Sequence, residues 1–127
     1  MGFEFLMITQ TRLLILAACL GMCFDFLSGF ANACMHHEVS SEKMRIGLWH
    51  KLGFLGCIAL GIYIEWLQGI SDIASYIGVE LPTTAAICIV ICVIEIVSIY
   101  ENIKKINPQV VKTPLDVLHN EDESDEE

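Results

Sequence analysis

Three carboxyl side chains interrupt otherwise apolar stretches of the sequence: Asp25, Glu65 and Glu95. An ionisable residue inside a long apolar segment is expensive to bury and marks a functional site by default. As a neutral acid it donates a hydrogen bond, and as an anion it only accepts them and holds water or cations. We therefore take these three acids as the first candidate site residues. Their chemistry depends on the segments that carry them.

Small residues recur at every fourth position around two of the acids. Positions four apart share one face of a helix, and stripes of small residues let membrane helices approach closely. The pattern predicts that these faces pack within a protomer and also associate between protomers, whereas the simpler interpretation is packing within a protomer alone. The first stripe is Ala17, Gly21, Asp25, Gly29 and Ala33, and the second is Gly53, Cys57, Gly61, Glu65 and Gly69.

Other kinds of site find little support. The six cysteines form no CxxC pair and fall in or beside the apolar stretches, where free cysteine behaves as a small hydrophobic residue. No nucleophile–base pair, glycine-rich phosphate loop or HExxH motif is present. We expect no catalytic residue, no metal site and no cofactor.

The apolar stretches are long enough to cross a membrane. The chain has 127 residues, of which 54% are hydrophobic and 18% charged, and a span needs about 20 apolar residues. Spans are predicted at about residues 13–35, 52–70 and 81–100. A soluble three-helix bundle is disfavoured, because a chain of this size cannot bury three helices that are apolar all round. We therefore expect an all-α integral membrane protein with three transmembrane helices.

The first stretch has an alternative interpretation as a cleaved secretory signal. Ala31, Asn32 and Ala33 resemble a cleavage site. The apolar region of a signal is typically about 7–15 residues long, however, and this stretch is longer and contains Asp25. We therefore expect a retained span.

The charged residues divide the chain into two parts. Acids outnumber bases 16 to 7, and seven of the acids lie in the last twelve residues. Residues 1–106 are predicted to form the membrane domain, and residues 107–127 a cytoplasmic segment that ends in a disordered acidic tail. No basic face is available for nucleic acid.

Lysine and arginine predict the orientation. Three of them, Lys43, Arg45 and Lys51, fall in the segment between the first two spans, and Lys104 and Lys105 follow the third span. The loop between the second and third spans has none. Because cytoplasmic loops are enriched in these residues, we expect the first loop and the C-terminus inside the cell and the N-terminus outside.

Several motifs in this order resemble one known family, the phage holins of the toxin-secretion and phage-lysis type. The resemblance covers roughly residues 13–118. It rests on DFLSGF at 25–30, SSEK at 40–43 with Gly47-Leu48 and Lys51-Leu52-Gly53 following, EIVSIYEN at 95–102, and Pro114-Leu115. The acidic last eight residues depart from the pattern of the family.

The resemblance implies a function. Holins accumulate in the bacterial cytoplasmic membrane, form homo-oligomers and open lesions that release an endolysin or a toxin, so the three acids would line the lesion. Two alternatives stay open. One is an antiholin, a regulatory membrane partner that titrates a holin, and the other is a small proton-coupled exporter. An exporter usually needs four spans and an aromatic pocket around its acid.

Overall fold

The described part of the chain is entirely helical. A computed structural model describes residues 2–70 and 81–109, which form α1 (Gly2–Met35), α2 (Ser41–Ile70) and α4 (Thr83–Ile106), with no strand among them. All three helices are long and apolar enough to cross a membrane. The predicted all-α fold with three spans is confirmed. The predicted disordered tail lies outside the described residues.

Helix α2 begins earlier than the predicted second span. The Ser40 hydroxyl accepts a hydrogen bond from the Lys43 amide at 3.5 Å, and Glu42 lies in the first turn. An N-terminal serine cap followed by an acidic residue stabilises a helix start. The prediction that Lys43, Arg45 and Lys51 occupy a loop is therefore wrong, because all three lie on α2.

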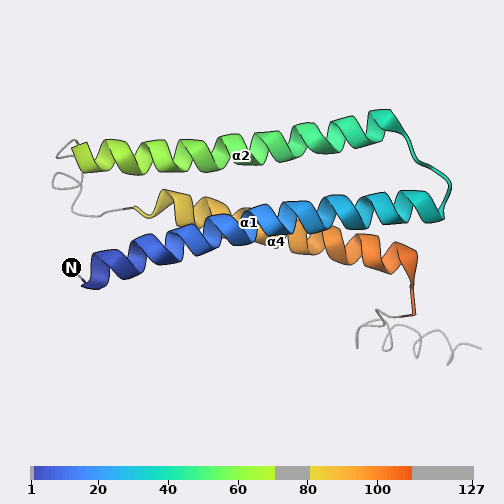
Figure 1. Ribbon diagram of the computed structural model, residues 1–127, viewed down its shortest axis with the longest axis horizontal. Helices are drawn as coiled ribbons and strands as arrows, with labels where there is room; N and C mark the ends of the chain where they lie inside the picture. The colour runs from blue at the N-terminus through green and yellow to red at the C-terminus, as the bar shows by residue number, and fades with distance from the viewer. Residues whose placement is uncertain (1, 71–80, 110–127) are drawn as a thin grey trace, which may run out of the picture.

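Helix α1 ends in a tight turn that reverses the chain. His37 adopts a left-handed conformation with φ 53°. Its amide donates to the Cys34 carbonyl at 3.3 Å, and the Glu38 amide donates to the Ala33 carbonyl at 3.0 Å. These two bonds form a Schellman motif, which satisfies the last carbonyls of the helix. Helix α2 consequently runs back antiparallel to α1 (Figure 1).

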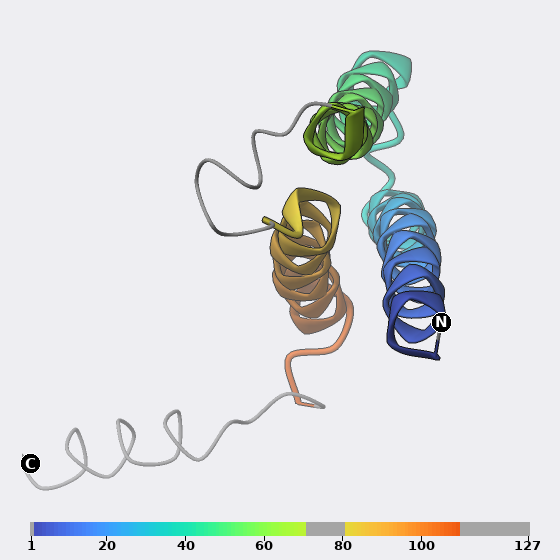
Figure 2. The same cartoon turned by 90° about the vertical axis from the view of Figure 1, so that its left-hand side faces the viewer.

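The three helices occupy the corners of a triangle when viewed near their axes (Figure 2). Helix α4 packs most extensively on α1 and less on α2, while α1 and α2 touch little. The buried apolar core is small and consists of Ala18, Met22, Ile58, Cys88 and Ile91. Large apolar side chains such as Leu13, Phe24 and Ile96 point outward and are 59–64% exposed. These outer faces need lipid or another protein to cover them.

Candidate functional site

A single lysine joins all three helices through two carboxyl groups. The Lys51 Nζ on α2 lies 2.7 Å from Asp25 Oδ2 on α1, and it also pairs with Glu95 Oε2 on α4. We call Asp25, Lys51 and Glu95 the charge cluster. The cluster brings together two of the three acids singled out in the sequence.

The charge cluster lies deep between the helices. We call the end of the bundle where residues 36–40 join α1 to α2 the loop end. Each member of the cluster lies roughly 15 Å along its helix from the loop end, at 1.5 Å per residue. For α4 this position is the middle of the helix. If α4 crosses the bilayer, the cluster is near its centre, where charge is costly unless it is paired.

Burial within the cluster is uneven. The Glu95 side chain is 1% exposed, whereas those of Asp25 and Lys51 are each 15% exposed. Both Asp25 oxygens have partners, because Oδ2 faces Lys51 and Oδ1 accepts from Asn102 Nδ2 at 3.3 Å. By contrast, Glu95 Oε1 is buried and has no hydrogen-bond partner. One oxygen of the cluster therefore stays uncompensated.

A polar layer between α1 and α4 supports the cluster on its loop-end side. Asn102 Nδ2 also donates to Ser28 Oγ at 3.1 Å, and the Ser28 hydroxyl donates to the Asp25 carbonyl at 3.0 Å. The Ser28 bond is made to the main-chain carbonyl of Asp25, while the bond from Asn102 to Oδ1 links the Asp25 carboxylate itself to α4. Lys51 additionally lies 5.8 Å from the centre of the Phe54 ring, at a distance that permits a cation–π contact.

The glycines of α1 make room for this arrangement. A Cβ atom at Gly21 would lie 3.3 Å from Glu95 Cβ, and one at Gly29 would lie 3.5 Å from Asn102 Nδ2. A Cβ atom at Gly21 would require Glu95 to shift by a few tenths of an ångström, whereas one at Gly29 would make an ordinary van der Waals contact. Ala33 lines the pocket described below, while Ala17 is exposed. Gly21 and Gly29 of the predicted α1 stripe thus face α4 within the protomer.

The stripe on α2 is divided between two environments. A Cβ atom at Gly61 would lie 3.0 Å from Thr84 Cα and 3.0 Å from Ile87 Cδ1, so this glycine is packed tightly against α4. A Cβ atom at Gly53 would meet nothing within 4 Å, and Cys57 is exposed. Within the protomer, the Gly61 and Glu65 part of the stripe therefore contacts α4, whereas Gly53 and Cys57 are exposed.

Glu65 lies apart from the other two acids. Its Oε1 accepts a hydrogen bond from the Thr84 amide at 2.8 Å, and the Thr83 hydroxyl donates to the Gly61 carbonyl at 3.0 Å. The first amides of a helix lack partners within that helix. Pro82 at the cap position makes no side-chain capping bond. Glu65 therefore caps α4 at the end of the bundle opposite the loop end.

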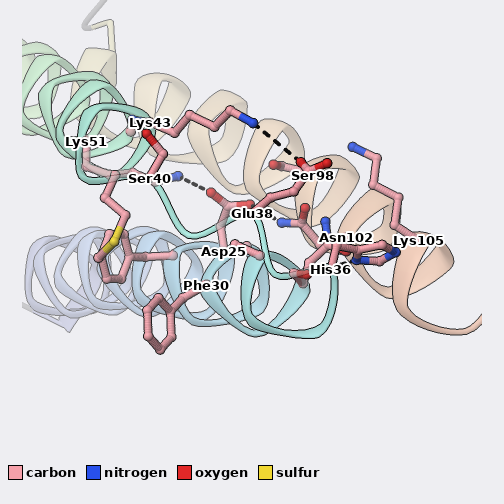
Figure 3. A pocket seen from close by; sticks show the side chains of 16 residues that line it. Asp25, Phe30, His36, Glu38, Ser40, Lys43, Lys51, Ser98, Asn102 and Lys105 are labelled. Atoms are coloured by element: carbon pink, nitrogen blue, oxygen red, sulfur yellow. Dashed lines mark hydrogen bonds and ion pairs between the residues drawn. The ribbon is translucent and has the colours of Figure 1, made fainter.

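A pocket opens beside the charge cluster (Figure 3). It has a volume of about 530 Å³ and is lined by side chains of α1, α2 and α4 and by the loop. Asp25, Lys51 and Asn102 contribute to its wall, as do Ser98 and Lys105. The pocket gives water a place next to the cluster, because it is both roomy and partly polar.

The other predicted topology residues remain near the surface. Lys43 pairs with Glu38 at 3.5 Å, and both side chains are well exposed at 72% and 68%. Arg45 and Lys104 are exposed, and Lys105 is exposed at the pocket. Among the residues expected to set the orientation, Lys51 differs, because it is part of the charge cluster.

Sequence reasoning missed the partners of the acids. Lys51 was expected to contribute only to orientation, and neither Ser28 nor Asn102 was predicted as a site residue. The spacing could have indicated part of this layer. Glu95 and Asn102 are seven residues apart and share one helix face. Asp25 and Ser28 are three residues apart and also share one.

Metal and disulfide chemistry find no support in residues 2–70 and 81–109. No group of three or more histidine, cysteine, aspartate or glutamate side chains there is placed to hold a metal ion. All six cysteines are free thiols.

Comparison with known proteins identifies the family to which the chain belongs. The sequence model of the bacteriophage holin family matches residues 3–120. Neither the curated proteins nor the solved structures contain a significant match. The family match runs through all three helices and every residue of the charge cluster and its polar layer. The chain therefore belongs to the bacteriophage holin family.

Proposed function

We propose that the protein is a holin, which forms oligomers in the bacterial cytoplasmic membrane and opens lesions that release an endolysin or a toxin. The observation that carries this proposal is the family match over residues 3–120, which includes all three membrane-spanning helices. In the proposed orientation the loop end and the C-terminus face the cytoplasm.

The distribution of polar groups supports a two-state protein. In the protomer, Asp25, Lys51 and Glu95 face one another and the outward surface is apolar. Such a protomer suits dispersion in lipid. A lesion needs a water-facing wall instead, and these side chains supply polar groups for it if the helices separate. Ionised carboxylates are much more stable in water than in lipid, so wetting favours the separated arrangement.

A test in bacterial cells separates a holin from the alternatives. The chain is expressed from an inducible promoter, alone and together with an endolysin that lacks its own export signal. Membrane potential is followed with a dye, and lysis by turbidity. We expect depolarisation in both strains and lysis only in the strain that carries the endolysin.

Two controls complete the design. Endolysin without the chain must leave turbidity unchanged, and membrane fractions must contain the chain. If the chain accumulates in the membrane without depolarisation or endolysin release, the proposal is wrong. An antiholin or exporter would give that result, and only an antiholin would delay lysis by a second, active holin.

A further inference from the structure

The charge cluster does not balance its own charges. It contains one ammonium group and two carboxyl groups, so full ionisation leaves a net charge of −1 deep between the helices. Further cationic groups do not reach it: Lys43 pairs with Glu38, and no bond from Lys105 to the cluster is formed among residues 2–70 and 81–109. Burial of an unbalanced charge is strongly unfavourable.

The hydrogen bonds indicate which carboxyl group carries the unbalanced negative charge. Asp25 has partners for both oxygens, whereas Glu95 is the more deeply buried acid and has a partner for only Oε2. An anionic Glu95 would leave a charged oxygen buried without a donor. A neutral Glu95 removes that charge and still accepts a hydrogen bond from Lys51 through its carbonyl oxygen.

We propose that the charge cluster is a proton-binding site, in which Glu95 holds one proton on Oε1 while Asp25 and Lys51 form the ion pair. The closed protomer then carries no net charge between its helices. When the helices separate in a lesion and water reaches Glu95, the proton passes to water and the anion is hydrated. The proton therefore stabilises the closed state.

The direction of the pH effect follows from linkage. Because the closed state binds this proton and the open state releases it, raising the pH favours opening. One proton changes the ratio of open to closed protein by at most tenfold per pH unit. The charged groups that face Glu95 are Lys51 from α2 and, through Lys51, Asp25 from α1. The titratable groups that line the adjacent pocket are His36, Glu38, Lys43 and Lys105.

This inference rests on the proposed holin function, and its test distinguishes failure of the proton site from failure of the holin function. The full chain is reconstituted into vesicles at increasing density, and the density at which a trapped dye escapes is measured from acidic to mildly alkaline pH. We expect that threshold density to fall as the pH rises. In Glu95→Gln, whose side chain is neutral at every pH, the threshold should not change with pH.

Removal of Asp25 gives an independent check of the charge count. Asp25→Asn leaves one ammonium and one carboxylate, which balance without a proton, so its threshold should also be independent of pH. The matched control is Glu65→Gln at the opposite end of the bundle. This variant should keep the pH dependence of the wild type. If Glu95→Gln retains that dependence, or the wild type lacks it, the inference is wrong.

Infrared spectroscopy tests the proton without any need for lesions. The resting wild-type protein should show the carbonyl stretch of a protonated carboxyl group, and Glu95→Gln should lose it while Glu65→Gln keeps it. Absence of the Glu95 band overturns the proton site even if the vesicles leak. Conversely, vesicles that never leak at any density or pH overturn the holin function, even if the band is present.

Discussion

The Lys51 ammonium lies 2.7 Å from the carboxylate of Asp25, although α1 and α2 otherwise touch little. This ion pair is therefore a principal link between the two helices. The same lysine pairs with Glu95 on α4, so one side chain connects the whole bundle.

Lys51→Met should destabilise the protomer severely. The substitution leaves two carboxyl groups without their cation, and removal of one partner from a buried ion pair costs about 3–5 kcal/mol. Unfolding in detergent, followed by circular dichroism, measures the loss. Lys43→Met is the matched control, because that lysine belongs to an exposed pair worth about 0–1 kcal/mol. Equal stability of the two variants would show that Lys51 does not stabilise the protomer.

Gly61→Leu and Gly53→Leu should behave differently, although both glycines belong to one sequence stripe. Gly61 is packed against Thr84 and Ile87, whereas the space at Gly53 is open. Overpacking at Gly61 should cost about 1–3 kcal/mol and separate α2 from α4. Gly53→Leu should leave the stability of the protomer unchanged.

Cross-linking of Gly53→Leu tests association between protomers. If the Gly53 and Cys57 surface forms an interface between copies, Gly53→Leu should reduce cross-linked oligomers in membranes without loss of protomer stability. Unchanged oligomers in this variant would show that the exposed part of the stripe is not an interface.

Glu65→Leu should loosen the start of α4. The substitution removes the acceptor of the Thr84 amide, and loss of such a cap costs typically about 1 kcal/mol. Faster hydrogen exchange at that amide is the expected result. Glu65→Gln keeps a side-chain oxygen in place and should exchange nearly as slowly as the wild type. If Glu65→Leu also exchanges slowly, Glu65 does not act as the cap.

The orientation can be tested by labelling single cysteines in a cysteine-free background. A cysteine at Ser75 should react with a membrane-impermeant reagent in intact cells, and one at Ser41 only after permeabilisation, because the lysines and arginines favour a cytoplasmic loop end. Labelling at Ser41 in intact cells would reverse the proposed topology.

The spans were predictable from sequence, while the site was predictable only in part. Length and apolar composition are enough to predict three helices that can cross a membrane, since a chain of this size cannot bury three such helices by itself. The depth of Asp25 and Glu95 follows from counting residues along the helices. Their shared partner does not, because pairing with Lys51 is a tertiary contact between helices and leaves no local pattern.

Local patterns also failed where neighbouring helices decide the environment. Gly53 and Gly61 have the same spacing and the same residue type, yet only Gly61 meets α4. Glu65 interrupts an apolar stretch as Asp25 does, but it caps α4 instead of joining the charge cluster. Such differences depend on how α2 lies against α4, which the spacing within α2 alone does not determine.

Release of an endolysin-sized protein from vesicles shows whether this chain by itself opens a membrane to proteins. The purified chain is reconstituted at increasing density in vesicles that contain the protein cargo. We predict retention at low density and abrupt release above a threshold. Retention of the cargo at every density, with the chain fully inserted, would show that the chain alone does not open a lesion for proteins.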